Sequence, residues 1–187
     1  MRKYFYSNTF ILLSKLGGVI LEFRKAEIFD LESIAKIIED AKDFLKDNKV
    51  SQWQDGYPEI EDLKKDIEKG ESYVLLKDSE VIGTSVISLE GESTYNTIED
   101  GKWLSSDKYI VMHRVAISSK YRGKNIFKEL ICEAEKIALD NYIYSIKIDT
   151  HKDNKAMQRA LCNNGFTKCG IIFLEDGSER VAYEKLL

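Results

Sequence analysis

Apolar residues along this chain recur at two spacings, one typical of half-buried strands and one typical of amphipathic helices. Runs of strand length, rich in β-branched residues, occupy residues 21–24, 72–77, 81–89, 110–117, 146–150, 166–173 and 180–186. The helical spacing recurs over residues 31–45, 58–69 and 126–138. Asp30 is placed to cap the first of these helices and Pro58 to open the second, while Asp153 or Asn154 would cap a further helix.

These elements follow one another in the order β-α-α-β-β-β-α-β-α-β-β, without repeats or a second domain. Tight-turn signals at residues 78–80 and 175–177 support hairpins between neighbouring strands. Residues 90–107 have no clear periodicity and are predicted to form a long polar connection, either a substrate-side loop or a mobile excursion. The pattern predicts one domain of mixed α/β class, and 187 residues are enough for a substantial core.

Residues 108–140 combine a strand, a short basic turn and a helix. The turn contains Gly123 together with Lys120, Arg122 and Lys124. The first turn of a helix has backbone amides without intrahelical acceptors and carries a partial positive charge. A glycine-bearing turn directly before it can aim further amides at the same point, and Gly123 allows close approach of a phosphate. This order of elements predicts a pyrophosphate-binding cradle.

Other kinds of site are not supported. The chain has neither the P-loop pattern GxxxxGK followed by Ser or Thr nor the dinucleotide pattern GxGxxG. A net charge of −4 argues against nucleic-acid binding, and no apolar run approaches the length of a membrane span. The three cysteines form no CxxC pair and the chain has two histidines, so we expect no metal. An odd, sparse cysteine count fits a reducing cytoplasm.

The basic turn resembles the coenzyme A signature of the GNAT acyltransferase superfamily, which is a strand, then Gln/Arg-x-x-Gly-x-Gly/Ala, then a helix. Here it reads Lys120-Tyr121-Arg122-Gly123-Lys124-Asn125, with Lys for Gln or Arg and Asn for the second Gly or Ala. Asn tolerates left-handed backbone, so we expect the turn to form. Downstream, residues 154–166 begin with Asn154 and end in Gly165-Phe166, which resembles the superfamily's closing segment. The resemblance extends over residues 21–187.

The resemblance implies the GNAT fold, a mixed and mostly antiparallel sheet of about six or seven strands flanked by about four helices. It also implies acetyl-CoA as cosubstrate, with the pantetheine arm paired along the central strand like an added strand. The residues that it places against the cosubstrate are Val115, Ile117, Lys120, Tyr121, Arg122, Gly123, Lys124, Asn125, Ile126 and Asn154. The alternative interpretation is an ordinary β-α turn with a lysine-rich surface.

Acetyl transfer to an amine needs a base for the amine's proton and a hydrogen-bond donor for the carbonyl oxygen. In many members of the superfamily, a Tyr four residues before the Gly of Gly-Phe is the suggested acid. Here that position is Leu161, which cannot donate a proton. Its neighbour Cys162 is interpreted as a buried structural cysteine.

Both histidines are candidate catalytic residues. His113 lies in the central strand, two and four residues before Val115 and Ile117, and is predicted to share their face unless a bulge inverts it. The alternative is a core histidine hydrogen-bonded across the sheet. His151 follows a strand at its carboxyl end, where α/β sheets place ligands, and its alternative is a surface-loop histidine.

Aromatic residues near the first helices are candidate acceptor contacts. The resemblance implies that these helices line the acceptor side, so Trp53 and Tyr57 are predicted to contact the substrate. Trp53 could equally staple the helices together. Trp103, in the long connection, is a further candidate.

Residues 1–20 differ in character from the rest of the chain. Arg2 and Lys3 precede an apolar run at residues 10–13, which is too short for a signal peptide. Gly17-Gly18 can be encoded by GGAGG, the form of a bacterial ribosome-binding site, and Leu21 by the start codon TTG. We therefore expect the natural protein to start at Leu21, so that residues 1–20 are an upstream extension and residues 21–187 the acyltransferase domain. The competing interpretation is an extra helix or strand packed on the domain.

These interpretations predict a cytoplasmic N-acetyltransferase that moves an acetyl group from acetyl-CoA to a primary amine by direct attack. The acceptor would be a small-molecule amine or a peptide amine, and neither nucleic acid nor membrane is expected as a partner. The C-terminal strands could pair across a homodimer. The alternative is a non-catalytic acyl-CoA-binding sensor or partner module, which Leu161 favours and the two histidines oppose.

Overall fold

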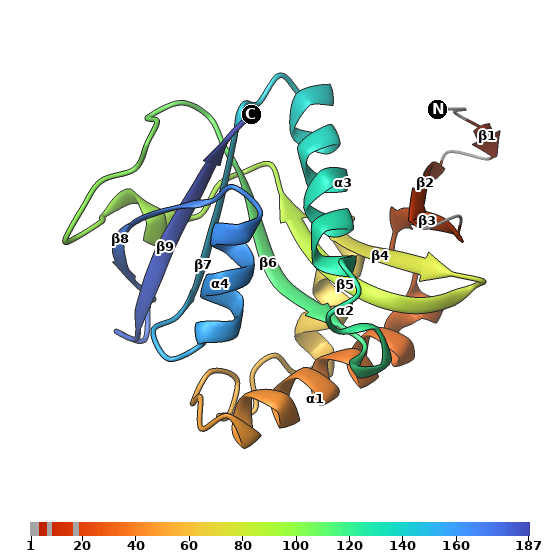
Figure 1. Ribbon diagram of the computed structural model, residues 1–187, viewed down its shortest axis with the longest axis horizontal. Helices are drawn as coiled ribbons and strands as arrows, with labels where there is room; N and C mark the ends of the chain where they lie inside the picture. The colour runs from red at the N-terminus through yellow and green to blue at the C-terminus, as the bar shows by residue number, and fades with distance from the viewer. Residues whose placement is uncertain (1–3, 7–8, 17–18) are drawn as a thin grey trace.

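The computed structural model describes residues 4–6, 9–16 and 19–187, with side chains described from Ile20 onward. The described strands form one sheet in the order β1-β2-β3-β4-β5-β6-β7-β9-β8 (Figure 1). Every neighbouring pair is antiparallel except β6 and β7, which are parallel. The predicted mixed and mostly antiparallel sheet is therefore confirmed, as is its flanking by α1 to α4.

From β3 onward the elements agree with the predicted order, and their ends shift by a few residues; β1 and β2 were not part of that order. The strands are β1 (Tyr4–Tyr6), β2 (Thr9–Leu16), β3 (Val19–Lys25), β4 (Ser72–Lys77), β5 (Glu80–Ser88), β6 (Ile110–Ile117), β7 (Ser145–His151), β8 (Thr167–Phe173) and β9 (Glu179–Leu186). The helices are α1 (Leu31–Asp47), α2 (Ile60–Glu68), α3 (Ile126–Asp140) and α4 (Lys155–Asn163). Short 3-10 turns occupy Ile28–Asp30, Ser93–Asn96 and Ser119–Tyr121.

Helices cover both faces of the sheet. On one face α3 and α4 pack down, and Leu130 and Leu161 meet Ile146 of β7 in the largest buried cluster. On the other face Ile38 of α1 and Leu63 of α2 pack against β4. The amphipathic stripes read from the sequence are thus core-facing, as the helical spacing predicts.

The long connection between β5 and β6 covers the part of the second face that α1 and α2 leave free. Tyr95, from the 3-10 turn of this connection, is 2% exposed and packs with Val111 of β6 and Ile172 of β8. Backbone hydrogen bonds of 2.8 Å join Glu99 and Ile171 in both directions along the β8 edge. The connection is therefore docked on the sheet, and the interpretation as a mobile excursion is wrong.

The parallel strands β6 and β7 part soon after they meet. Their described pairing stops at Val111 and Lys147, although each strand continues for several residues. A β-bulge follows in β6, where Arg114 has a φ of 47° and the β5–β6 register shifts. Backbone groups that would pair in a regular sheet are left available between the strands.

Two predicted helix starts differ from the structure. Asp30 precedes α1, but its carboxylate accepts hydrogen bonds from Arg24 at 2.6 and 3.0 Å and from the Glu27 amide at 2.8 Å, without capping the helix. The prediction that Pro58 opens α2 is wrong, because the helix begins after Glu59. The Glu59 carboxylate caps the first turn in a reciprocal capping box.

β1 and β2 extend the sheet at the β3 edge, with Leu12 opposite Phe23 in the register. Residues 1–3, 7–8 and 17–18 lie outside the described residues, and they include Gly17-Gly18. The proposed start at Leu21 stays a prediction. In the part of the chain that the structure describes, no helix is long and apolar enough to cross a membrane.

Candidate active site

A cleft of about 980 Å³ opens where β6 and β7 part. Its walls come from residues 112–117 of β6, residues 148–151 of β7, the loop after α1 and the start of α4, and its rim includes the β8–β9 turn. Because the two strands have separated here, a ligand that carries amide groups can hydrogen-bond along the edge of β6.

The turn before α3 has the backbone of an anion cradle. Gly123 has a φ of 75° and Asn125 a φ of 62°, so both adopt the left-handed backbone that their residue types favour. Among the described residues, no acceptor bonds the amides of Gly123, Asn125 or Ile126. A Cβ at Gly123 would meet no atom within 4 Å. These amides can therefore be donated to an anion at the N-terminus of α3.

The basic side chains of this turn already have partners within the protein. Lys120 Nζ lies 3.4 Å from Glu80, and Arg122 donates to a carbonyl of α1 at 2.7 Å while lying over a phenylalanine ring of that helix. Lys124 lies 5.1 Å from the centre of the Tyr121 ring. Of the cofactor contacts expected from the sequence, those that line the cleft are Val115, Ile117, Arg122, Gly123 and Asn154. Those that do not line it are Lys120, Tyr121, Lys124, Asn125 and Ile126.

The bulge in β6 places His113 and Val115 on opposite faces of the sheet. Val115 and Ile117 pack against the core under α3, whereas the His113 ring lies 6.4 Å from the Tyr95 ring on the other face. The shared face expected from simple alternation is wrong, because the extra residue at Arg114 inverts the alternation. His113 and Val115 still both border the cleft.

His113 lies beside carboxylates from two other segments. Its Nε2 is 3.6 Å from a carboxylate oxygen of Glu92 in the long connection. Desolvation by the surrounding protein lowers the pKa of His113 below its ordinary value, against the opposing influence of Asp149 and Glu92. The imidazole is therefore neutral at physiological pH and can accept a proton.

The long connection contributes Glu92 and Tyr95, which sequence reasoning missed. The Tyr95 hydroxyl donates to Asp149 of β7 at 2.7 Å, and Arg180 Nε of β9 lies 3.8 Å from the other oxygen of that carboxylate. Burial, and then the charge of Asp149, raise the pKa of Tyr95 well above its ordinary value, so the phenol stays protonated. Asp149 lies near the carboxyl end of β7, a position that could have marked it, whereas the aperiodic connection carries no such signal.

His151 lies at the mouth of the cleft and contacts the loop after α1. Its Nε2 is 3.2 Å from Ser51 Oγ, and its Nδ1 accepts from the Asp153 amide at 3.2 Å. Because an amide can only donate, Nδ1 carries no proton in this arrangement and Nε2 donates to Ser51. Burial, and then the charge of Arg180, lower the pKa of His151. Both ring nitrogens are thus engaged, and His151 links β7 to the loop.

Asn154 caps α4 and also borders the cleft. Its Oδ1 accepts from the Met157 amide at 3.1 Å, which confirms the predicted cap. Its Nδ2 donates to Gln52 Oε1 at 3.1 Å. The loop after α1 is therefore joined to the β7–α4 junction by this bond and by the contact between Ser51 and His151.

Both aromatic residues predicted to contact the acceptor line the cleft. Trp53 also packs against the buried cluster of α1 and α2, so it does staple these helices. The Tyr57 ring lies 5.2 Å from the guanidinium of Arg114, which pairs with a carboxylate of α2 at 3.1 Å. Trp103 lies over the ammonium of Lys147 instead and does not border the cleft.

The residue at the usual acid position has a packing role. Leu161 is fully buried in the core under α4. Cys162, expected to be buried, is exposed, because the next residue of a helix points about 100° away. Within the described ranges, no group of His, Cys, Asp and Glu has an arrangement that could hold a metal ion.

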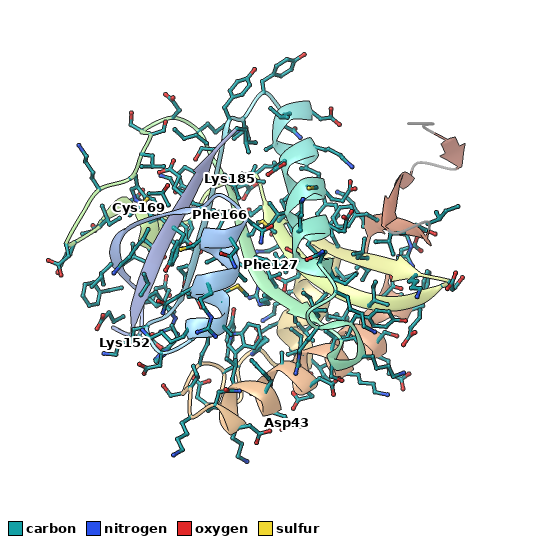
Figure 2. The ribbon with its side chains drawn as sticks, viewed as in Figure 1. Asp43, Phe127, Lys152, Phe166, Cys169 and Lys185 are labelled. Atoms are coloured by element: carbon teal, nitrogen blue, oxygen red, sulfur yellow. The ribbon has the colours of Figure 1, made fainter. Side chains whose placement is uncertain are left out.

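The closing segment anchors α4 to the sheet. Gly165 follows the helix with a φ of 86°, and Phe166 is 4% exposed. Figure 2 shows Lys185 of β9 beside Phe166, and the ammonium lies 5.9 Å from the ring centre. Lys185 also bonds the Asn164 carbonyl at 2.8 Å and pairs with Glu135 of α3 at 2.6 Å. This anchor holds the helix whose first turn meets the cleft.

The chain is similar to proteins of one family. The model of the Acetyltransferase (GNAT) family matches residues 37–166. An acetyltransferase of the GNAT family from Streptococcus agalactiae has a similar structure, with a TM-score of 0.81 and 29% identity over 92% of this chain and 98% of that chain. No curated protein sequence matches this chain.

Two further structures share the fold at lower identity. A GNAT-family acetyltransferase from Listeria monocytogenes has a TM-score of 0.72 and 23% identity, over 94% of this chain and 100% of that chain. The PaiA N-acetyltransferase from Thermoplasma acidophilum, solved in complex with coenzyme A, has a TM-score of 0.69 and 20% identity, over 89% of this chain and 99% of that chain.

Proposed function

Because the chain belongs to the GNAT acetyltransferase family, we propose that it is an N-acetyltransferase. It moves the acetyl group of acetyl-CoA to a primary amine of a small molecule or a peptide, by direct attack of the amine on the thioester. The observation that carries the proposal is a parted β6–β7 pair with an anion cradle at the end of the cleft. The PaiA enzyme, which shares the fold, holds coenzyme A.

The cradle and the edge of β6 bind different parts of the cosubstrate. Backbone amides around Gly123 and the first turn of α3 bind the pyrophosphate, and the free edge of β6 pairs with the pantetheine arm. Arg122, in the cleft wall, adds positive charge near the phosphates. The Asn154 amide exchanges its bond to Gln52 for one to the pantetheine arm, while its oxygen keeps the α4 cap.

His113 takes the proton of the attacking amine. Most amines are protonated near neutral pH, so attack needs a base, and His113 is neutral and borders the cleft. Glu92, 3.6 Å from its Nε2, stabilises the imidazolium that forms. In this mechanism, amides along the free edge of β6 donate to the carbonyl oxygen as it gains negative charge.

Turnover does not require an acid at position 161. Breakdown of the tetrahedral intermediate breaks the carbon–sulfur bond, and coenzyme A leaves as a thiolate. The cysteine side chain, an alkyl thiol like that of coenzyme A, has a pKa of about 8.5, so a thiolate can leave without prior protonation. Leu161 is thus compatible with acetyl transfer.

Leu161 also supports a second candidate, a non-catalytic module that binds acyl-CoA as a sensor or partner protein. Such a module needs the cradle and the β6 edge but neither a base nor an acid. The pairing of His113 with Glu92 opposes it, because binding alone has no use for a neutral imidazole beside a carboxylate.

Titration calorimetry with acetyl-CoA and with CoA, followed by a panel of amines assayed for thiol release, tests the proposal. Micromolar binding with amine-dependent thiol release supports the transferase. Binding without release for any amine supports the sensor, and absence of binding contradicts both. A cytoplasmic location and a homodimer remain proposals, and light scattering on the purified chain tests the second.

A further inference from the structure

Two buried charged residues face each other across neighbouring strands beneath the long connection. Lys147 of β7 and Glu184 of β9 are register partners, and they are 3% and 0% exposed. Burial lowers the pKa of Lys147, while the charge of Glu184 raises it. A buried charge is costly unless its contacts compensate, so what these groups bind is informative.

Both residues bind the long connection. The Lys147 ammonium lies 4.2 Å from the centre of the Trp103 ring and 3.9 Å from that of Tyr109. Such contacts are strongest when the cation is desolvated. Glu184 accepts hydrogen bonds from the backbone amides of residues 104 and 105 at 2.5 and 3.4 Å, and from Ser145 at 2.6 Å. We call Lys147 and Glu184 the charged clamp.

Each of the two rings that Lys147 contacts belongs to a residue that is hydrogen-bonded to Tyr95 or Glu92. Trp103 Nε1 donates to the Tyr95 carbonyl at 2.8 Å, and Tyr95 in turn holds Asp149. The Tyr109 hydroxyl bonds the Glu92 carbonyl at 3.3 Å and the Glu92 amide at 3.4 Å. Glu92, which lines the cleft, and Tyr95, which packs beside the His113 ring, are therefore the two residues of the connection that these rings hold.

We propose that Lys147 and Glu184 are positioning residues, which hold the long connection so that Glu92 and Tyr95 close over His113 and keep it desolvated. The inference deepens the proposed function and rests on it. Neither clamp residue borders the cleft in the described structure, so the effect passes through the connection.

Loss of the clamp has a defined electrostatic consequence. The charged groups around His113 are Asp149 of β7, Glu92 of the connection, Glu71 before β4 and Arg114 of its own strand. Desolvation, aided by the charge of Arg114, lowers the pKa of His113 against the opposing influence of the three carboxylates. A loosened connection admits water, so the pKa of His113 rises toward the ordinary value of about 6.5. Since the base must be neutral, the acidic limb of kcat/KM moves to higher pH.

The test compares Lys147→Met, which removes the charge at similar length, with Lys147→Arg, which keeps charge and ring contact. The His113 pKa is read by NMR titration of the imidazole signals, and His151→Gln assigns them because the chain has two histidines. Lys147→Met is expected to raise the His113 pKa, to shift the acidic limb equally and to lower kcat/KM about three- to tenfold. Lys147→Arg is expected to retain the His113 pKa, the acidic limb and the kcat/KM of the parent protein.

A core variant on the other face, Ile131→Val in α3, controls for lost stability. If Lys147→Met lowers the melting temperature as that variant does, without moving the His113 pKa, the clamp is structural only and the inference is overturned. If Lys147→Met does not fold, Trp103→Phe replaces it, because it keeps a ring over Lys147 but loses the bond to Tyr95; no pKa shift there also overturns the inference. A shifted pKa in a chain that transfers no acetyl group would overturn the proposed function and leave the positioning supported.

Discussion

At the scale of single residues, burial shifts the pKa values of His113, which borders the cleft, and of Tyr95, which packs beside it, in opposite directions. It lowers the pKa of His113 and raises that of Tyr95, because in each case a low-dielectric surrounding disfavours the charged form. The result is a neutral imidazole beside a protonated phenol. A group able to accept a proton and a hydrogen-bond donor fixed to Asp149 thus coexist at one pH.

We predict that His113→Gln lowers kcat about a hundredfold or more, with little change in the Kd of acetyl-CoA. In the parent protein, kcat/KM should fall as the pH drops through the His113 pKa, which lies below the ordinary value, so activity should persist to mildly acidic pH. Steady-state kinetics over pH measures both effects. A variant that loses folding stability but keeps its activity per folded molecule would show that His113 is a core histidine.

Charge near the cradle should affect the Kd of CoA through long-range electrostatic attraction more than through direct contact with the ligand. Lys124 does not border the cleft but lies beside the free amides, so Lys124→Glu is expected to raise the Kd of CoA about two- to fivefold at low salt. The same charge change at Lys65, on the exposed face of α2, serves as the matched control. Calorimetry at increasing salt should show the difference shrinking, and a Kd that does not respond to the substitution would argue against the cradle.

At the scale of elements, the long connection replaces a helix as the cover of one face of the sheet. It lies along β8 with very little clearance, because an added Cβ at Gly101 would collide with the Cys169 carbonyl oxygen. The amide of the next residue, Lys102, bonds the same oxygen at 2.9 Å. This contact also covers the β8 edge, which is otherwise open to pairing with another chain.

We therefore predict that Gly101→Ala lowers the free energy of unfolding by about 2 kcal/mol or more and promotes aggregation. Chemical denaturation and light scattering measure these effects. Gly177→Ala is the control, because its φ of 79° is strained for alanine but no atom lies within 4 Å, so it should cost only about 1 kcal/mol. Equal losses for the two variants would mean that the connection is not docked closely at this point.

At the scale of the whole molecule, the cleft is assembled from segments between Ala41 and Arg180. Residues 1–20 contribute nothing to its lining in the described structure. A chain that begins at Leu21 is therefore expected to bind acetyl-CoA with a Kd within about twofold of the full chain, since every contacting residue is kept. Calorimetry on both chains measures this. Recovery of a peptide spanning Tyr4 to Lys15 from the native protein would refute the proposed start at Leu21.

The sequence alone determined those features that depend on residues close together along the chain. The order of strands and helices followed from hydrophobic spacing, because each element must present one face to the core. The left-handed turn at Gly123 and Asn125 and the α4 cap at Asn154 followed from residue chemistry at single positions. The backbone of the proposed cradle was predictable because all its parts lie within one β-turn-α segment.

Only the tertiary structure decided what lies opposite these segments. The bulge at Arg114 reversed the face of His113, and pairing of Lys120 and Arg122 within the protein left backbone amides as the main donors available to the proposed phosphate site. Tyr95 and Asp149 are 54 residues apart in the chain, and no local pattern relates them. Packing across such separations depends on the whole folded chain. The contact between Tyr95 and Asp149 could therefore not be predicted from spacing or residue type.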